Sequence, residues 1–409
     1  MRKQWLNDEI VDGELCVMDE IVVSLHAQTM LCEMDNRMMK RFCPMAVLLF
    51  VCLQTALAQH PTDDGLTLRS LLQQMGQRLL QNKTGSIVAI EPATGKVLCL
   101  ATNSPQGPDD ALAIATAYAP GSTIKTAQAL TLLSMGLIDE NTRVACYGSF
   151  RDGNIRVGCH RHPSPLGLVS ALAVSCNTWF LSQFMAMLND RFLFDDKNDA
   201  ITQWHDCMQS MGLGGPLGVD LPGEKGGLLP NVGYLARRYP KGWNARTIMW
   251  VGMGQGDITA TPLQLANLAA SIANRGWFRT PHIHTDASSS SLEQRFTKVD
   301  PMAYDLVVRG MRQAVLRGTC TAANSHLFTV CGKTGTVENS GKDHSVFIGF
   351  APMDNPKIAI AVLVEHGGFG ADLAAPMASV MMELYLKGKL TPAMEQRAVR
   401  LENKVIAEK

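Results

Sequence analysis

A serine and a lysine stand three residues apart at the point where an apolar helix is expected to begin. In the stretch AYAPGSTIKTAQALTLLSMG (117–136), Ser122 and Lys125 follow Pro120 and Gly121, and apolar residues then recur at helical spacing. Residues three apart share one face of a helix, so the lysine amine is predicted to lie beside the serine hydroxyl. A desolvated lysine can accept the proton of such a hydroxyl and make it a nucleophile. Taken alone, the pair is also compatible with a helix cap and a solvated charge.

Two further short motifs follow downstream: Ser175-Cys176-Asn177 and Lys333-Thr334-Gly335-Thr336. In the first, the serine hydroxyl is suited to relay a proton and the asparagine amide to hold Lys125. In the second, the lysine charge and the threonine hydroxyls are suited to bind a substrate carboxylate, and the glycine lets the backbone approach closely. The backbone N–H groups of Ser122 and Thr336 are predicted to form an oxyanion hole. Each motif alone fits a turn or an edge strand, but the three in this order indicate serine acyl transfer.

Longer stretches around these motifs resemble the transpeptidase domain of class B penicillin-binding proteins, especially the elongation-type penicillin-binding protein 2 family. The stretches are 85–105, 118–125, 174–180, 251–276 and 333–367. Among them, Gly254-Gln255-Gly256 resembles the G-Q-G loop that borders the active site in that family. The resemblance implies a penicillin-binding, serine β-lactamase-like fold. It also implies that a D-Ala-D-Ala stem peptide of peptidoglycan acylates Ser122, that the acyl group passes to an amine on a neighbouring strand, and that β-lactams acylate the same serine.

The same resemblance implies membrane proteins of the elongation complex as partners. The sequence differs from the family pattern in two places, since we expect no pedestal domain ahead of the catalytic region and the segment 105–118 is short. Two alternative functions stay open. One is a serine hydrolase, either a D,D-carboxypeptidase or a β-lactamase-like enzyme, which shares the acylation step. The other is a non-catalytic penicillin-binding sensor or scaffold.

Cysteine and histidine residues gather between the first two motifs, at Cys146, Cys159, His160 and His162. Thiolate and imidazole ligands at this spacing are compatible with a structural zinc ion. In an oxidising compartment Cys146 and Cys159 are equally suited to form a disulfide, and free buried thiols are the third interpretation. Serine acyl transfer itself needs no cofactor, so any zinc here is expected to be structural.

The elements that must position these residues follow an α+β pattern. Apolar runs predict strands at both ends of the catalytic region: 86–90, 96–101, 328–336, 345–351 and 357–365. Turn residues at 91–95 and 354–356 predict that the first two and the last two of these strands form hairpins. Helical periodicity dominates the middle and the flanks, at 66–81, 170–188, 262–275 and 301–317. We therefore expect an antiparallel sheet flanked by helices, with an all-helical subdomain. The transpeptidase domain is predicted to span 59–395, and a charged tail, helical or frayed, to follow at 396–409.

Composition narrows the class of partner. The 409 residues include 37 basic and 37 acidic side chains, so the formal net charge is zero, which argues against nucleic acid as a partner. A hydrophobic fraction of 46% is ample for a sizeable core. The 11 cysteines are scattered along the chain, which does not fit a small disulfide scaffold.

The N-terminal region has the pattern of an export signal. From Met38 the chain reads MMKRFCPMAVLLFVCLQTALAQ, a short basic start, an apolar run and a small-x-small site that ends at Ala58. The apolar run of about 15 residues is shorter than a membrane span requires, so 38–58 is predicted to be a signal peptide rather than an anchor. An extension of residues 1–37 ahead of such a signal is unusual, and translation is predicted to start at Met38 or Met39. The mature protein is then expected in the periplasm, at the outer face of the cytoplasmic membrane.

Overall fold

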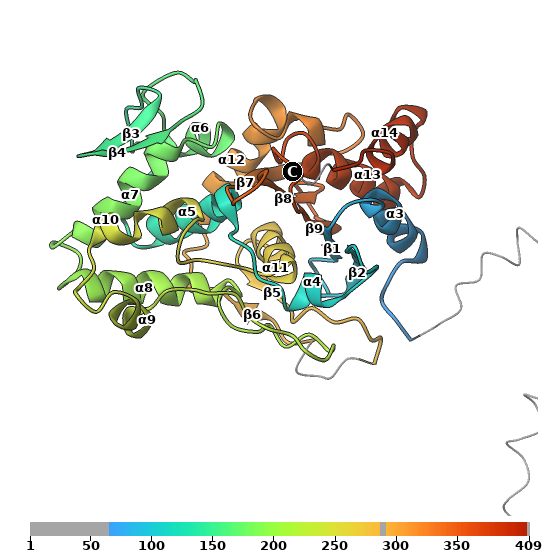
Figure 1. Cartoon of the computed structure of the whole chain (residues 1–409), viewed down its shortest axis with the longest axis horizontal. Coiled ribbons are helices and arrows are strands. Elements are labelled where there is room, and N and C mark those ends of the chain that lie inside the picture. Colours follow the sequence, from blue (N-terminus) through green and yellow to red (C-terminus); the bar gives the residue numbers. More distant parts are fainter. Residues whose placement is uncertain (1–64, 287–291, 407–409) are drawn as a thin grey trace, which may run out of the picture. The chain divides into compact units, whose positions relative to one another are not determined.

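A five-stranded antiparallel sheet organises the part of the chain that the computed structural model describes, residues 65–286 and 292–406 (Figure 1). The strand order is β2-β1-β9-β8-β7, so strands from both ends of this part pair with each other. These strands are β1 (Gly85–Ile90), β2 (Val97–Asn103), β7 (Cys331–Val337), β8 (His344–Ala351) and β9 (Ile358–Val364). The two predicted hairpins and the predicted α+β class are confirmed.

Helices cover both faces of the sheet, because its strands are apolar on both sides. Ile87 of β1 and Val362 of β9 belong to one core cluster, and Val88 and Leu363 next to them belong to the other. Alternate residues of a strand point to opposite faces, so the two clusters lie on opposite sides of the sheet. The first cluster is closed by α3 (Ser70–Leu80), α13 (Ala374–Lys387) and α14 (Pro392–Glu402), and the second by α4 (Ala111–Ile114) and α11 (Pro262–Ala273).

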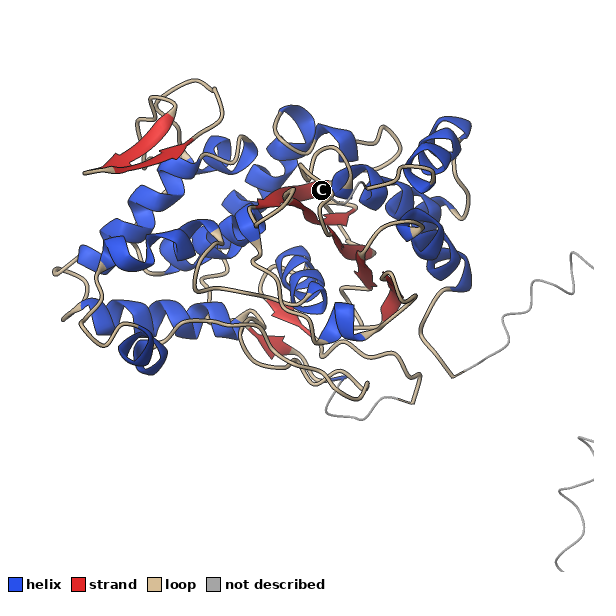
Figure 2. Cartoon of the chain, viewed as in Figure 1, coloured by secondary structure: helices blue, strands red, loops and turns tan. Residues whose placement is uncertain are grey.

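A mainly helical subdomain is inserted between β2 and β7, and its helices are the blue ribbons on the left of Figure 2. Its helices are α5 (Lys125–Ser134), α6 (Leu168–Ala173), α7 (Asn177–Asn189), α8 (Lys197–Ser210), α9 (Val232–Arg238) and α10 (Ala245–Ile248), with the 3-10 turns η1 (Gly121–Ile124) and η2 (Met249–Met253). Helix α12 (Ala303–Arg317) contacts both α6 and β7 and so joins the subdomain to the sheet. Smaller elements are β5 (Trp277–Phe278), β6 (Arg295–Phe296) and η4 (Thr321–Ala323).

The subdomain also carries a short hairpin, β3 (Ser149–Asp152) and β4 (Ile155–Gly158), which the sequence analysis did not predict. In Figure 1 this hairpin lies at the edge of the molecule, beside α7 and α6. Phe150 and Val157 on its inner face pack with Leu181 of α7 and with Met249 and Met253 of η2. The hairpin is therefore anchored to the subdomain by its own small apolar core.

Two predicted boundaries differ from the structure. The single helix predicted for 170–188 is wrong, because the chain breaks between α6 and α7, where Ser175 has a left-handed backbone with φ of +57°. The predicted boundary at 395 lies inside α14, whose Ala398 and Leu401 are buried in the core. The extension 1–37, the signal segment 38–58 and the predicted domain start at 59 lie outside the described residues. Among the residues that are described, no helix is long and apolar enough to cross a membrane.

Candidate active site

Ser122 and Lys125 lie at the start of the first helix of the subdomain. Ser122 is in the 3-10 turn η1, and Lys125 is the first residue of α5. Side chains three apart in a 3-10 turn are eclipsed, so the two project from the same side of the chain. Lys125 is fully buried, whereas Ser122 is partly exposed and its hydroxyl hydrogen-bonds to none of the described residues. The serine is thus open to a ligand, and the amine behind it is shielded from water.

The amine of Lys125 is held by the second motif. Its Nζ donates to Oδ1 of Asn177 at 2.6 Å and to the carbonyl oxygen of Ser175 at 3.0 Å, and it lies 3.4 Å from the Ser175 hydroxyl. No carboxylate within the described ranges forms an ion pair with it. Burial, together with the nearby ammonium of Lys333, holds the pKa of Lys125 well below its ordinary value. These conditions favour a neutral amine, which is able to accept a proton.

The turn at Ser175 connects the second motif to the third. Its left-handed backbone is uncommon for a residue with a side chain, and such residues often mark functional sites. The turn lets Ser175 offer its carbonyl oxygen to Lys125 while its hydroxyl accepts a hydrogen bond of 2.8 Å from Lys333. Ser175 therefore lies between the two buried lysines.

The third motif occupies β7, an edge strand that pairs only with β8. Lys333 is fully buried, and burial lowers its pKa to about 8. Thr334 donates a hydrogen bond of 2.7 Å to the hydroxyl of Thr319, a residue that the sequence analysis did not single out. Thr319 also donates its backbone N–H to the carbonyl of Ala173 at the end of α6, so it links the strand to the start of the second motif.

Glycines bring three backbone segments together beside Ser122. The N–H of Gly121 donates to the carbonyl of Gly254 at 2.9 Å, and a Cβ on Gly254 would lie only 2.0 Å from the carbonyl oxygen of Gly121. Gly254 has φ of +84°, which also favours glycine. A Cβ on Gly121 would lie 2.9 Å from the carbonyl oxygen of Thr336. The Gly254-Gln255-Gly256 turn and the end of β7 therefore both adjoin the serine turn, as the proposed oxyanion hole requires.

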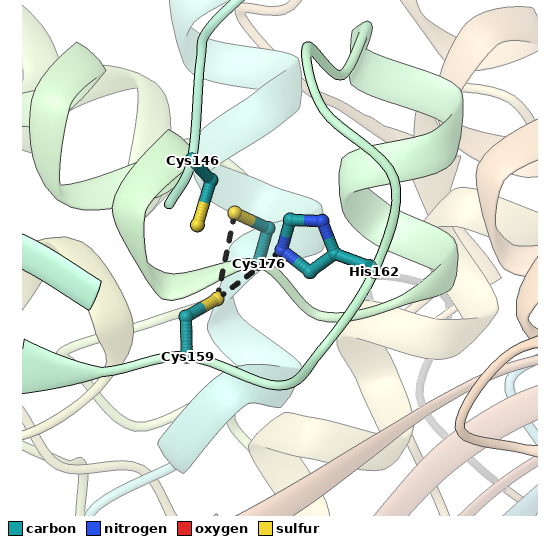
Figure 3. A group of neighbouring side chains, drawn as sticks. All are labelled: Cys146, Cys159, His162 and Cys176. Atoms are coloured by element: carbon teal, nitrogen blue, oxygen red, sulfur yellow. Dashed lines mark hydrogen bonds between the residues drawn. The ribbon is translucent and has the colours of Figure 1, made fainter. Parts of the chain in front are cut away.

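Four metal-ligating side chains gather directly behind the second motif: Cys146, Cys159, His162 and Cys176, which we call the cysteine cluster (Figure 3). Their ligand atoms all lie within 4.8 Å of one another. The candidate ligand His160 is exposed and lies outside the cluster, so the structure groups His162 alone of the two histidines with the cysteines. The fourth residue is Cys176, which the sequence analysis treated only as the middle of the Ser-x-Asn motif. Of the three interpretations of Cys146 and Cys159, the disulfide is not formed in this structure, since both thiols are free.

The donor set of the cysteine cluster fits a zinc ion. Three thiols and one imidazole are a common tetrahedral zinc ligand set. The Nδ1 of His162 lies 2.7 Å from the carbonyl oxygen of Pro163 while its Nε2 lies 3.4 Å from the Cys159 sulfur. Such a second hydrogen bond orients the ring of a ligating histidine and leaves the other nitrogen free for the metal. The hydrogen bond between the Cys159 and Cys176 sulfurs, 3.6 Å apart, also lowers the pKa of Cys159, which favours a thiolate.

The cysteine cluster contacts the active site through Asn177. The backbone N–H of Asn177 donates to the Cys159 sulfur at 3.3 Å, and its side-chain Nδ2 donates to the carbonyl of Gly158 at 2.9 Å. The remaining side-chain atom, Oδ1, accepts the bond from Lys125. The orientation of this amide, and with it the position of the lysine amine, is therefore set by the end of β4.

The fold and this arrangement of motifs define the class of protein. A match to the family described as "Penicillin binding protein transpeptidase domain" covers residues 85–383, which include the whole sheet and all three motifs. The chain belongs to this family. The peptidoglycan D,D-transpeptidase MrdA of Acinetobacter baumannii is 32% identical over 378 residues, which are 80% of this chain and 54% of that protein. The MrdA of Escherichia coli K12 is 25% identical over 79% of this chain and 58% of its own length. The chain spans just over half the length of these relatives.

Solved structures of similar proteins agree with this assignment. Pseudomonas aeruginosa PBP2 in complex with WCK 5153 is 30% identical, with a TM-score of 0.69, and the match covers 80% of this chain and 77% of that one. Helicobacter pylori PBP2, solved in a complex with MreC, has the same TM-score over 80% of this chain and 64% of its own, at 23% identity. The second likeness shows a shared fold, and the first also supports a relationship to the penicillin-binding protein 2 group.

Proposed function

We propose that this protein is a peptidoglycan D,D-transpeptidase that forms a serine acyl-enzyme. The observation that carries this proposal is the fully buried amine of Lys125, one turn from the open hydroxyl of Ser122 and hydrogen-bonded to Ser175 and Asn177. A buried lysine with a lowered pKa and no carboxylate partner in the described part of the chain is suited to general-base catalysis. The family match and the D,D-transpeptidase relatives support the same activity.

In the acylation step, Oγ of Ser122 attacks the carbonyl carbon of the penultimate D-alanine while Nζ of Lys125 accepts the hydroxyl proton. The backbone N–H groups of Ser122 and Thr336 donate to the oxyanion. The peptide bond then breaks, and the terminal D-alanine leaves with that proton, relayed through the Ser175 hydroxyl. Lys333 and Thr334 bind the terminal carboxylate.

In the transfer step, an amine of a neighbouring stem peptide attacks the acyl carbon. The amine proton passes through Ser175 to Lys125 and from there to Oγ of Ser122, which leaves as the free hydroxyl. The product is a new peptide cross-link, and the enzyme returns to its starting state. Attack by water in place of the amine is the corresponding hydrolase reaction, so the lifetime of the acyl-enzyme distinguishes the two activities.

The test is intact-mass analysis of the full chain after incubation with benzylpenicillin, with Ser122→Ala as the matched variant. We expect a stable adduct of one penicillin per chain that is absent from the variant. Consumption of the drug without a lasting adduct would identify a β-lactamase-like hydrolase. Neither adduct nor drug loss would contradict the proposal and favour a non-catalytic sensor or scaffold. Cross-linked products from a pentapeptide donor and an amine acceptor would then separate a transpeptidase from a D,D-carboxypeptidase.

The cysteine cluster is proposed to hold a structural zinc ion through Cys146, Cys159, His162 and Cys176. The ion supplies no group to the acyl transfer, and its role is to fasten the end of β4 to the turn that carries Asn177. Elemental analysis of the purified full chain should give about one zinc per chain. His162→Ala should lower that stoichiometry, and His160→Ala is the matched control that should not. Zinc retained at full stoichiometry by His162→Ala would contradict the site. Protein without zinc whose Cys146 and Cys159 thiols react only after reduction would contain a disulfide instead.

We also propose that the protein is exported and works at the outer face of the cytoplasmic membrane. The signal-like segment 38–58 and the extracytoplasmic substrate support this location. A membrane protein of the elongation complex is the proposed partner, since the H. pylori relative has been solved with MreC. Alkaline phosphatase fused after Asp64 should be active in cells, because that enzyme folds only outside the cytoplasm. An inactive fusion that is nonetheless made in full would contradict export.

A further inference from the structure

The outer face of the β3–β4 hairpin carries two arginines whose side chains form no ion pair or hydrogen bond with any of the described residues. Arg151 and Arg156 lie directly opposite each other in the hairpin, and both are exposed. Phe150 and Val157, their neighbours in sequence, form the next cross-strand pair and point inward to the apolar core. Because successive side chains alternate between the two faces of a strand, the arginine pair points outward.

Packing does not explain this arginine pair. Like charges directly opposite each other destabilise an antiparallel pair of strands. The one carboxylate of the hairpin, Asp152, is taken up by Arg246 of α10, with hydrogen bonds of 2.7 and 2.8 Å. Across residues 65–286 and 292–406, no carboxylate forms an ion pair with Arg151 or Arg156. The hairpin thus presents two guanidinium groups whose repulsion an external anion would offset.

The sequence around the arginine pair is also positively charged. Residues 143–162 contain four arginines and one aspartate, although the chain as a whole has no net charge. Arg161 is exposed, and Tyr147, just before β3, is 90% exposed. Cationic guanidinium groups bind carboxylates through two parallel hydrogen bonds, and an exposed aromatic ring adds a flat contact surface. These groups favour an anionic ligand of extended shape.

The hairpin also contacts residues of the active site directly. The carbonyl of Gly158, at the end of β4, accepts a hydrogen bond from Asn177, whose other side-chain atom holds Lys125. On its inner face the hairpin packs on Met249 and Met253 of η2, which leads directly into the Gly254 turn. The hairpin that would hold a polymer is therefore in direct contact with two segments that border the serine turn.

We propose that the outer face of the β3–β4 hairpin is an accessory binding site for peptidoglycan, at which Arg151 and Arg156 bind the carboxylates of stem peptides on a strand already in the wall. This inference rests on the proposed transpeptidase function, since it assigns a docking surface to that substrate. Anionic lipid headgroups share the same charge, but continuity with Asn177 and the Gly254 turn favours the polymer that must reach Ser122.

The test is co-sedimentation of the full chain with purified peptidoglycan sacculi. Arg151→Gln/Arg156→Gln should weaken binding about 5- to 10-fold at low ionic strength, and about 0.5 M salt should remove the difference by screening. Arg151→Lys/Arg156→Lys should retain most of the binding. Arg317→Gln/Arg400→Gln, which removes two exposed arginines elsewhere, is the matched control and should bind as the parent does.

The proposal would be overturned if Arg151→Gln/Arg156→Gln bound sacculi as the parent does, or if the Arg317→Gln/Arg400→Gln control lost as much binding. It would also be overturned if Arg151→Gln/Arg156→Gln lost binding to anionic lipid vesicles but not to sacculi. The rate at which a small fluorescent penicillin acylates Arg151→Gln/Arg156→Gln should stay within about 2-fold of the parent rate, because that ligand does not reach the hairpin. If the parent itself is not acylated, the proposed function fails while the docking result stands on its own. Should the double variant melt early, the single variants Arg151→Gln and Arg156→Gln carry the test.

Discussion

Lys333 and Asn177 both reach the Ser175–Lys125 pair, but the structures that hold them differ in kind. Lys333 lies on β7, which the ladder with β8 fixes along its whole length. Asn177 follows a left-handed turn and is oriented by a short hairpin and by the Cys159 sulfur. We call β7 around Lys333 the strand side of the site, and the turn that carries Ser175, Cys176 and Asn177 the turn side. Apolar packing and backbone hydrogen bonds hold the strand side, whereas polar groups and thiols hold the turn side.

This difference predicts where the active site is vulnerable. Although β7 is an edge strand, it is paired with β8 along its whole length, and a slip of one residue would turn its buried side chains to the opposite face. The turn at Ser175 has no such safeguard, because Cys176 and Asn177 are positioned by individual side-chain contacts. We therefore expect substitutions of similar size to affect catalysis more on the turn side than on the strand side.

The largest effect is expected at the lysine that both sides enclose. Lys125→Met keeps the length and burial of the side chain but removes the amine that accepts the proton of Ser122. The rate of acylation by a fluorescent penicillin should fall about 1,000-fold, the range that a general base supplies. The melting temperature should not fall, because an apolar side chain replaces a buried amine. A variant that is acylated within about 10-fold of the parent rate would show that another group is the base.

A matched pair of cysteines tests the comparison itself. Cys176 and Cys331 are both fully buried, the first in the turn and the second on β7, two residues before Lys333. Each change to alanine should lower the free energy of unfolding by about 1–3 kcal/mol in urea titrations. Only Cys176→Ala should also slow acylation, by about 10-fold, because Cys176 caps α7 and belongs to the cysteine cluster. Equal acylation rates in the two variants would remove the distinction between the two sides.

The same difference explains what the sequence could predict. The motifs and the sheet hairpins follow from residue type and apolar periodicity, and they were found. The turn at Ser175 was missed because helical periodicity runs through 170–188 and does not register a single left-handed residue. Spacing could not decide between His160 and His162, since only the folded loop determines which ring turns inward. The two-residue loop Gly153-Asn154, a pair that often joins hairpin strands, could have revealed β3–β4.

The tripeptide Lys-Thr-Gly also shows the limit of a short motif. It occurs a second time at 83–85, where β1 begins. There the amine of Lys83 donates to the carbonyl oxygens of Gln81 and Glu402, and so serves to join α3 to α14. Only the copy at 333–335 lies on an edge strand beside Ser175. Position in the fold, rather than the tripeptide, assigns the chemistry.

On the strand side, Lys333 should make the free energy of unfolding depend on pH. The pKa of Lys333 is about 8 in the folded protein and about 10.5 in an unfolded chain. Between these values the unfolded state binds more protons, so this group makes the free energy of unfolding rise with pH, by at most about 1.4 kcal/mol per unit. Subtracting the urea-unfolding profile of Lys333→Met from that of the parent should leave a positive slope between pH 8 and 10. A flat difference would mean that Lys333 is not held in a low-pKa state.

The smallest effect is expected at the residue that bridges the two sides. Thr319 accepts a hydrogen bond from Thr334 on β7 and donates its backbone N–H to Ala173 at the end of α6. Thr319→Val keeps the backbone bond and the shape but leaves the Thr334 hydroxyl without its acceptor, which costs about 1 kcal/mol. Acylation should slow by about 3- to 5-fold, mainly through weaker binding of the penicillin carboxylate, and Thr319→Ser should restore the parent rate. If Thr319→Val instead slowed acylation as much as Cys176→Ala, the strand side would depend on single side-chain contacts in the same way as the turn side.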